Sequence, residues 1–272
     1  MENQLYTTLN NGKRMPLLGL GTYNMLGAVA VNAVSTALET GYRLIDGAQM
    51  YSNEKEVGEG IRRSGIPREE IFITTKIDNC NQGYDETLRS YAQSLKDLRI
   101  DKVDLLLIHW PIKGKREATW KALEKLYADD QVGAIGTGNY LLPFLHELSE
   151  YASIIPAVNQ IEFSPFLYLK EELDYCQRHH ICLQCYTPLM RGNKHDDPRI
   201  VQLAQRYSRT PAQIILRWAV QQGLSTIPKS ENPARIRENF NIFNFEIAAP
   251  DLDTLNNLNE QFRIVDNPID ML

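Results

Sequence analysis

The sequence predicts an α/β protein, a closed (β/α)8 TIM barrel whose bottom is closed by an N-terminal β-hairpin. Three observations predict this fold. Eight short apolar runs alternate with amphipathic segments along the 272 residues. Several of these runs are apolar almost throughout, as strands buried on both faces of a parallel sheet are. The alternative is an open doubly wound sheet, but Gly19-Leu-Gly21 lacks the third glycine of the dinucleotide-binding fingerprint that such a sheet would carry.

A hairpin is expected first, because Asn11-Gly12 is the strongest short turn signal and lies between two segments that read as strands. The eight barrel strands follow in chain order. We expect them at residues 17–20, 42–45, 71–75, 103–108, 134–137, 157–161, 181–186 and 225–228.

Between the predicted strands, apolar residues recur with helical spacing. Leu88, Tyr91, Leu95 and Leu98 follow steps of three and four residues, which place them on one helix face. The segment 210–213, Thr-Pro-Ala-Gln, opens a later helix with a Thr cap, a proline at the first position and a Gln for a capping box. Without an internal repeat, low-complexity segment or linker, we expect one barrel domain over residues 1–272.

Composition limits the classes of partner. Hydrophobic residues make up 43% and charged residues 23% of the chain, as in soluble globular proteins. The net charge of −5 is spread along the chain, which disfavours nucleic acid and anionic membranes as partners. No apolar stretch approaches the ~20 residues that span a bilayer, and no basic and apolar signal opens the chain. We therefore expect a cytoplasmic protein.

The four cysteines do not predict a metal or redox site. Cys182 and Cys185 have the spacing of a zinc or redox pair, but they lie in an apolar run that reads as a strand. Residues three apart on a strand point to opposite faces, so we expect both in the core. His179-His180 ends a probable helix and is interpreted as a surface pair. No metal site is expected.

Chemistry in such barrels belongs at the C-terminal ends of the strands. Asp46 ends the second predicted strand, Tyr51 follows it, Lys76 ends the third, and His109 follows the fourth. Each residue alone is more often structural. Together they suit carbonyl reduction, in which the phenol donates a proton and the Lys76 ammonium lowers its pKa. Asp46 would hold the ammonium, and His109 would hydrogen-bond the carbonyl oxygen.

The segment 41–54, with Asp46, Tyr51 and Glu54, closely resembles the signature of the aldo-keto reductases. Segments 71–76, 107–111 and 227–230 match further motifs of the family in the right order. The likeness runs from the hairpin to Asn239 and is greatest to short bacterial members such as 2,5-diketo-gluconate and methylglyoxal reductases. It implies a monomeric NADPH-dependent reductase of aldehydes and ketones, with Tyr51 as proton donor.

The resemblance also implies an NADPH site along the strand ends. Asn139 and Gln160 would hold the nicotinamide carboxamide, the Tyr186 ring would stack on the nicotinamide, and residues 187–192 would pass over the pyrophosphate. The full implied set is Gly21, Thr22, Tyr23, Asp46, Asn139, Gln160, Tyr186, Thr187, Pro188, Leu189, Arg191, Gly192, Ile227, Lys229, Ser230, Arg235, Glu238 and Asn239.

NADPH is expected over NADH on separate grounds. Asn232 can cap a helix that begins at Pro233, and a helix N-terminus favours an anion. Lys229, Ser230 and Arg235 surround that helix start, which suits the 2′-phosphate of NADPH.

The implied substrate residues are Tyr23, Tyr51, Asp78, His109 and Trp110. Four positions depart from the family pattern: Gly47 replaces a common Thr, Gly138 a Ser, Tyr23 a Trp, and Asp78 an aromatic residue. The loop after Pro111 and the segment after Asn259 are also short. These departures lead us to expect a shallow pocket for small or polar carbonyls. Diketo compounds and aromatic aldehydes are the substrates that the resemblance implies.

Two other functions stay open at this point. A low-turnover NADP(H)-binding sensor would retain the fold, and the changes at Gly47, Gly138 and Asp78 suggest it. A metal-dependent hydrolase would need His and carboxylate ligands clustered on the strand ends. Only one histidine, His109, is predicted there, so the hydrolase is the weaker alternative.

Overall fold

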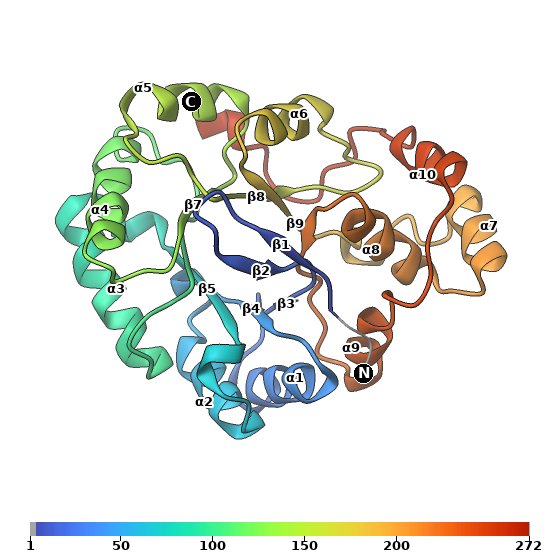
Figure 1. Ribbon diagram of the computed structural model, residues 1–272, viewed down its shortest axis with the longest axis horizontal. Helices are drawn as coiled ribbons and strands as arrows, with labels where there is room; N and C mark the ends of the chain where they lie inside the picture. Colours follow the sequence, from blue (N-terminus) through green and yellow to red (C-terminus); the bar gives the residue numbers. More distant parts are fainter. Residues whose placement is uncertain (1–3, 272) are drawn as a thin grey trace.

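The computed structural model describes residues 4–271 and contains a barrel of eight parallel strands surrounded by helices (Figure 1). Bridges from Leu18 to Thr226 and from Gly21 to Lys229 join the first strand to the last and close the barrel. The predicted (β/α)8 fold is confirmed, and strand ends differ from prediction by at most three residues. The strands are β3 (Leu20–Gly21), β4 (Leu44–Asp46), β5 (Phe72–Ile77), β6 (Leu105–Ile108), β7 (Ile135–Gly138), β8 (Val158–Glu162), β9 (Cys182–Tyr186) and β10 (Ser225–Thr226).

A helix follows each barrel strand, and two further helices lie outside this alternation, α7 before α8 and α10 after α9. The helices are α1 (Gly27–Thr40), α2 (Glu54–Ser64), α3 (Tyr84–Leu98), α4 (Arg116–Ala128), α5 (Leu142–Tyr151), α6 (Lys170–Arg178), α7 (Pro198–Tyr207), α8 (Pro211–Gln221), α9 (Pro233–Phe240) and α10 (Ala249–Asn256). None of the helices within residues 4–271 is both long and apolar enough to span a bilayer.

The predicted helix signals form as expected at two places. In α8, Thr210 accepts from the backbone N–H of Gln213, and the Gln213 side chain accepts from the backbone of Thr210, which completes the capping box. In α3, Tyr91 and Leu98 are buried, and Leu88 and Leu95 pack against the same core.

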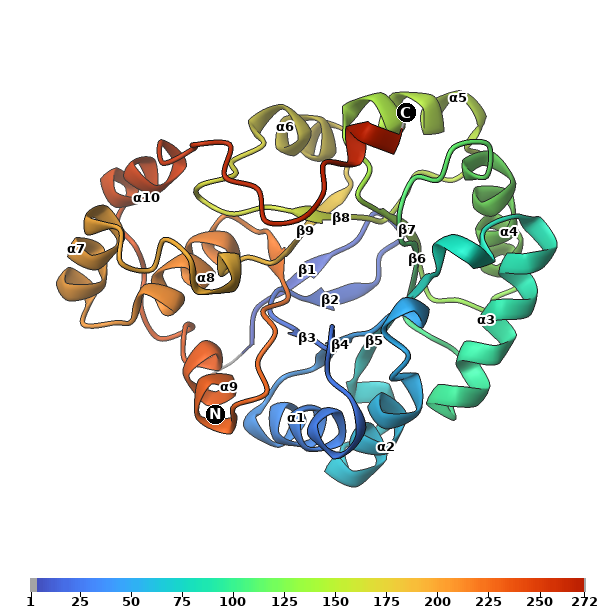
Figure 2. The same cartoon turned by 180° about the vertical axis from the view of Figure 1, so that it is seen from behind.

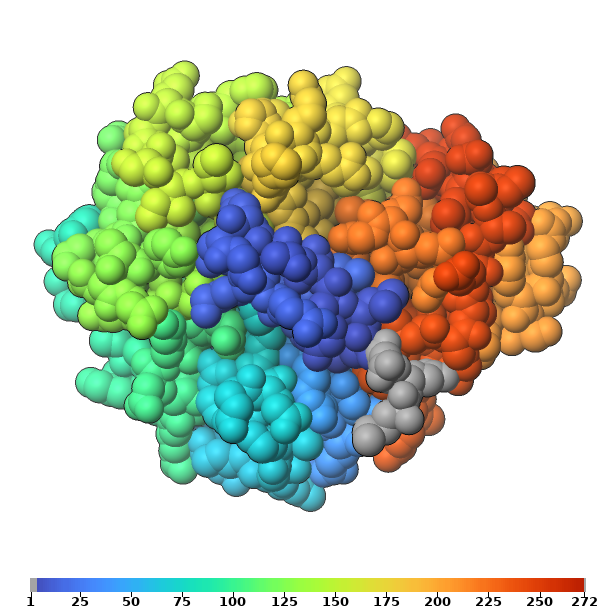
Figure 3. All heavy atoms as spheres, viewed as in Figure 1, coloured from blue at the N-terminus to red at the C-terminus, as the bar shows by residue number. Residues whose placement is uncertain are grey.

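The N-terminal hairpin pairs β1 (Tyr6–Thr8) with β2 (Arg14–Pro16) and crosses one end of the barrel (Figure 3). It lies in front in Figure 1 and behind in Figure 2. Asn10 and Asn11 donate side-chain hydrogen bonds to Pro156 O and Gly133 O, just before β8 and β7 begin. The hairpin therefore closes the bottom. Asn11-Gly12 lies in the turn of the hairpin, as predicted. The connection is nevertheless a five-residue loop, because Thr8 and Arg14 are the last paired residues.

The interior of the barrel changes from apolar to polar along its strands. Because side chains alternate along a strand, every second residue of each strand points inward. On β5 these residues are Phe72, Thr74 and Lys76, and on β8 they are Val158, Gln160 and Glu162. Phe72 and Val158 share an apolar cluster with Leu9 and Met15 of the hairpin segment. Polar groups consequently collect at the C-terminal ends of the strands.

The cysteines are free and serve the core, with the exception of Cys80, which is exposed. Cys182 packs against the apolar cluster inside the barrel, whereas Cys185 belongs to the core between strands and helices. The predicted opposite orientation of this pair is confirmed. Burial raises the pKa of the Cys182 thiol to about 12, so it is un-ionised at neutral pH.

Candidate active site

The structure brings the four predicted catalytic residues together on three neighbouring strands. Asp46 ends β4, and Tyr51 ends the short 3₁₀ turn Gln49–Tyr51 that follows it. Lys76 lies on β5, and His109 directly follows β6. Since β4, β5 and β6 are adjacent in the barrel, the four side chains meet at its C-terminal end.

The Lys76 ammonium is the centre of this group. Its Nζ atom donates to Asp46 Oδ1 at 2.5 Å, to the Gly47 carbonyl at 2.9 Å and to the Tyr51 phenol oxygen at 3.2 Å. The Lys76 and Asp46 side chains are 0% and 2% exposed. An ammonium has three hydrogens to donate, and all three have acceptors here, which is what a buried ion pair requires.

This arrangement leaves the Tyr51 hydroxyl hydrogen available. Lys76 donates to the phenol oxygen, so that oxygen acts as acceptor within the group. The ammonium also lies 4.9 Å from the centre of the Tyr51 ring. The phenol can therefore donate its own hydrogen toward the open end of the barrel, where a carbonyl oxygen would accept it.

The electrostatic balance at Tyr51 differs from the expectation. Burial raises the pKa of Tyr51 and outweighs the opposing effect of Lys76, so the net direction is upward. Burial also raises the pKa of Asp46, against Lys76 and Gln160. Burial lowers the pKa of Lys76, but the combined effect of Asp46 and Tyr51 raises it by more, so the net direction is upward. The phenol thus holds its proton at neutral pH, as a proton donor must.

His109 is buried beside the phenol and is neutral at pH 7. Its ring lies edge-on to Tyr51, with 5.6 Å between the ring centres. Burial, followed by the nearby Lys76 charge, lowers the pKa of His109 well below 6.5. Its Nδ1 atom is buried without a hydrogen-bond partner in the described part of the chain. We therefore assign the single ring proton to Nε2, since a buried N–H without an acceptor is rare.

The predicted substrate residues divide into two groups. Tyr23 is 52% exposed and lies edge-on to Tyr51 at 5.2 Å between ring centres. Asp78 instead accepts from the backbone N–H of Cys80 and caps the turn Asn79–Asn81. Trp110 is partly buried, and its carbonyl accepts from Gln82 Nε2 at 2.7 Å. Tyr23 therefore borders the reacting phenol, whereas the Asp78 carboxylate is engaged by its own loop.

Two residues for which the sequence predicted no role fix chain segments at the C-terminal end of the barrel. Asn53 is fully buried and donates to the carbonyls of Thr22 and Met25, both at 2.8 Å, which keeps the Tyr23 segment beside Tyr51. Glu162, at the end of β8, accepts from the backbone N–H groups of Ile264 and Val265 at 2.6 and 3.1 Å. This contact holds the C-terminal segment against the end of β8, where Figure 2 shows it in red beside β8 and β9.

Most of the implied cofactor residues follow β7 to β10, around the remaining half of the same end, while Gly21, Thr22, Tyr23 and Asp46 lie at β3 and β4. Gln160 Nε2 donates to Asp46 Oδ2 at 2.7 Å, which joins this half to the catalytic group. Asn139 Nδ2 donates to the His109 carbonyl at 2.9 Å, and the Tyr186 hydroxyl donates to Asn139 Oδ1 at 2.6 Å. Thr22 binds the Asp46 carbonyl through both its N–H and its hydroxyl.

The loop after β9 has an unusual backbone. Thr187, Met190 and Arg191 have φ angles of 49°, 48° and 54°, and Gly192 has 90°. Left-handed conformations are uncommon for residues other than glycine. Pro188 and Leu189 complete the segment, and the Leu189 carbonyl accepts from the Gly192 N–H at 2.8 Å. The loop is thus a series of tight turns beside Tyr186.

The start of α9 is capped as predicted, but the cap occupies the backbone N–H groups that an anion would otherwise bind. Asn232 Oδ1 accepts from the N–H groups of Ala234 and Arg235 at 2.8 and 3.3 Å, and Pro233 has no N–H. An anion here would therefore depend on side chains. Lys229 pairs with Glu231 at 2.5 Å, whereas the exposed Arg235 side chain makes no hydrogen bond or ion pair within residues 4–271.

The other implied cofactor positions have structural contacts. Glu238 Oε1 accepts from the Thr210 hydroxyl at 2.7 Å, and the Ile227 N–H donates to the Cys185 carbonyl at 3.1 Å. Ser230 and Asn239 are buried. Gly21 allows the barrel to close, because a Cβ atom there would lie 2.8 Å from the Ile227 carbonyl oxygen.

The departure at Gly138 also has a steric reason. A Cβ atom on Gly138 would lie 2.7 Å from the His109 carbonyl oxygen and 2.9 Å from that of Ile108. A serine therefore does not fit here without a shift of the backbone. A Cβ atom on Gly47 would meet only ordinary contacts at 3.5 Å or more, so the absence of a side chain there has no steric explanation.

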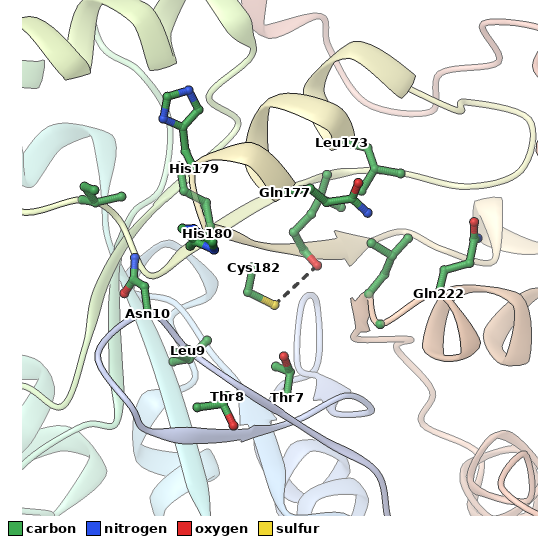
Figure 4. Close-up of a pocket in the computed structure, with 15 residues that line it drawn as sticks. Thr7, Thr8, Leu9, Asn10, Leu173, Gln177, His179, His180, Cys182 and Gln222 are labelled. Carbon is green, nitrogen blue, oxygen red and sulfur yellow. Dashed lines mark hydrogen bonds between the residues drawn. The ribbon is translucent and has the colours of Figure 1, made fainter.

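A groove of about 690 Å³ lies at the opposite end of the barrel, beside the hairpin (Figure 4). Thr8, Leu9, His180 and Cys182 are among its lining residues, and none of the four catalytic residues reaches it. No three or more His, Cys, Asp or Glu side chains of the described residues gather as metal ligands would.

The comparisons with known proteins identify the family. Residues 17–260 match the family described as the Aldo/keto reductase family. A glyoxal reductase of Bacillus subtilis (strain 168) is 46% identical over 265 residues, which cover 97% of this chain and 96% of the relative.

Two solved structures are similar over nearly their whole length. An aldo-keto reductase from a Medee basin deep-sea metagenome library is 41% identical, with a TM-score of 0.94 over 96% of this chain and 97% of the other. A variant of Gox0644 in complex with NADPH is 36% identical, with a TM-score of 0.94 over 98% of both chains. The family match and the 46% identical relative, together with the site described above, show that the chain belongs to the aldo/keto reductase family.

Proposed function

We propose that this protein reduces aldehydes and ketones to alcohols with NADPH, and that Tyr51 is the proton donor. The observation that carries the proposal is the buried Lys76 ammonium, which bonds both the Asp46 carboxylate and the Tyr51 phenol. No structural requirement of the barrel explains a charged pair at this depth, since apolar residues of similar volume would pack at least as well.

The side chains at the second half of the site suit NADPH. Asn139 and Gln160 would hold the carboxamide, and the Tyr186 ring would lie against the nicotinamide. The Arg235 guanidinium, which has no ion-pair partner among residues 4–271, suits the 2′-phosphate, since guanidinium groups form strong charge-assisted hydrogen bonds with phosphate. Lys229 would exchange Glu231 for the same phosphate, and the loop 187–192 would cover the pyrophosphate.

The chemistry then follows from the geometry. NADPH, when bound, supplies the hydride that adds to the carbonyl carbon. The Tyr51 hydroxyl donates its proton to the carbonyl oxygen as negative charge develops there. Lys76 stabilises the resulting phenolate, and Asp46 fixes the ammonium. His109 Nε2 donates a second hydrogen bond to the same oxygen and orients the substrate.

Small or polar carbonyl compounds are the substrates we propose. The half-exposed ring of Tyr23 lies beside Tyr51, where a larger aromatic residue would cover more of the Tyr51 ring. The 46% identical relative is named a glyoxal reductase, which acts on a small dicarbonyl. We further propose that the whole chain acts as a single domain and as a monomer in the cytoplasm.

The test is NADPH oxidation with a panel of glyoxals, diketones and aromatic aldehydes. Tyr51→Phe should lose at least about 100-fold in kcat, because the proton donor is removed while the ring remains. NADPH affinity should change little. Tyr6→Phe, at an exposed tyrosine of the hairpin, is the matched control and should behave as wild type.

Two outcomes would refute the proposal. Undiminished turnover in Tyr51→Phe would exclude this phenol as the donor. Tight NADPH binding by the wild type without turnover of any carbonyl in the panel would favour the alternative, a low-turnover NADP(H)-binding sensor.

A further inference from the structure

A chain of buried hydrogen bonds runs from the catalytic aspartate toward the bottom of the barrel. Gln160 Nε2 donates to Asp46 Oδ2 and to Gln184 Oε1, both at 2.7 Å. Gln184 Nε2 donates to Ser225 Oγ at 2.9 Å, and Ser225 Oγ donates to the Pro16 carbonyl at 3.4 Å. We call Gln160, Gln184 and Ser225 the amide relay; Gln184 and Ser225 are fully buried, and Gln160 is 3% exposed.

The two ends of the amide relay fix its direction. The Asp46 carboxylate at one end and the Pro16 carbonyl at the other can only accept hydrogen bonds. Ser225 must therefore donate to Pro16 and accept from Gln184. The Gln184 amide consequently turns its NH₂ group to Ser225 and its oxygen to Gln160.

This direction determines how Gln160 presents its amide. Both hydrogens of Gln160 Nε2 are used, one by Asp46 and one by Gln184. The Gln160 oxygen is then the acceptor left for another group. A reversed Gln184 amide would set two NH₂ groups against each other, and buried donors without acceptors are costly.

We propose that Gln184 is a positioning residue for the reaction, which acts by locking the side-chain amide of Gln160. The locked amide keeps a donor on Asp46 Oδ2 while Asp46 Oδ1 holds Lys76, and it keeps an acceptor for the nicotinamide carboxamide. This inference rests on the proposed function, because both roles concern the NADPH-dependent reaction. Gln184 itself lies on β9 and makes no hydrogen bond with any of the four predicted catalytic side chains within residues 4–271.

A double-mutant cycle tests the proposal. Gln184→Leu replaces the amide with an apolar side chain of similar size, and Gln160→Leu removes the residue through which Gln184 would act. In the wild-type background, Gln184→Leu should lower kcat and raise the Kd for NADPH by about 5- to 10-fold each. In the Gln160→Leu background, the same change should alter both by less than about 2-fold.

The matched control is Thr137→Val. Thr137 is likewise fully buried and donates to Asn159 Oδ1 at 3.0 Å, but it lies on the outer face of the strands and outside the amide relay. Its effect should be equal in the two backgrounds. If Gln184→Leu does not fold, Ser225→Ala removes only a hydroxyl and frees the Gln184 amide to rotate, and it should act in the same direction through Gln160.

The outcomes are distinct. Equal effects of Gln184→Leu with and without Gln160 would overturn the positioning role and leave a purely structural one. If the wild type neither binds NADPH nor turns over a carbonyl, the proposed function fails instead. Urea unfolding of the same four proteins needs no cofactor, and additive changes in the free energy of unfolding would show that Gln184 does not orient Gln160 at all.

Discussion

The two halves of the active end differ in how completely the protein fixes them. On β4 to β6, Asp46 and Lys76 are nearly inaccessible to solvent, and the ammonium has a full set of acceptors. On β7 to β10, the implied cofactor residues use partners that a ligand would replace, such as Glu231 on Lys229 and Asn139 on Tyr186. Under the proposed function, the proton-donating group is thus built before any ligand arrives, whereas the cofactor half would exchange internal contacts for ligand contacts.

The largest expected effect comes from breaking the fixed half. Lys76→Met leaves the Asp46 carboxylate buried without its cation. We expect a loss of about 3–5 kcal/mol in the free energy of unfolding, as for other broken buried ion pairs. Activity should fall at least about 100-fold, because Tyr51 loses its stabilising charge. Urea unfolding and kcat measure these two effects.

The control for this change is Lys55→Met. The Lys55 side chain is 77% exposed and lies 3.8 Å from Asp97, so its ion pair contributes little. It should leave both activity and stability unchanged. A Lys76→Met protein with activity within tenfold of wild type would contradict the central role of the ammonium.

A smaller effect is expected in the cofactor half. Arg235→Ala should raise the KM for NADPH about 10- to 100-fold, since a charge-assisted hydrogen bond to phosphate is lost. The KM for NADH should stay the same, because NADH lacks the 2′-phosphate. Arg237→Ala, at an exposed arginine on the same helix, is the matched control. An equal rise for both cofactors would place the 2′-phosphate elsewhere.

The pH dependence of kcat/KM tests the fixed half of the site further. The pKa of Tyr51 is raised above 10.0 and that of His109 is lowered well below 6.5, in both cases chiefly by burial. The proposed mechanism has a protonated Tyr51 and a neutral His109, so we expect activity to change only above the first pKa and below the second. We expect kcat/KM to vary less than about 3-fold between pH 7 and pH 9. A larger rise or fall of kcat/KM within that pH range would mean that another group titrates.

The smallest effect concerns the cap of α9. Asn232→Ala should lower the free energy of unfolding by about 1 kcal/mol, because the N–H groups of Ala234 and Arg235 lose their acceptor. Thermal denaturation measures it. Catalysis with saturating NADPH should persist, since the cap touches no reacting group. A large loss of kcat would show that the helix start does more than hold Arg235.

The sequence predicts the fold and the grouping of Asp46, Tyr51, Lys76 and His109 for identifiable reasons. Apolar runs and capping signals are local, so the eight strands and the α8 capping box follow from neighbouring residues. The turn of the hairpin does not follow from Asn11-Gly12 alone, because Leu9 and Met15 pack into the barrel and set its register.

The parts that sequence reasoning missed depend on distant partners. Asn53 and Gln184 act through groups 24 to 41 residues away, and nothing near them in the chain indicates those contacts. A lone Gln within the apolar run 181–186 was the one available signal. The net pKa direction at Tyr51 was also beyond reach, because burial is a property of the assembled barrel.

The most direct test of the account is a crystal structure of the protein with NADP. We expect the nicotinamide ring between Tyr186 and the Tyr51 phenol, its carboxamide on Asn139 and Gln160, and the 2′-phosphate on Arg235. A cofactor bound in the groove beside the hairpin, or a nicotinamide ring remote from Tyr51, would contradict it.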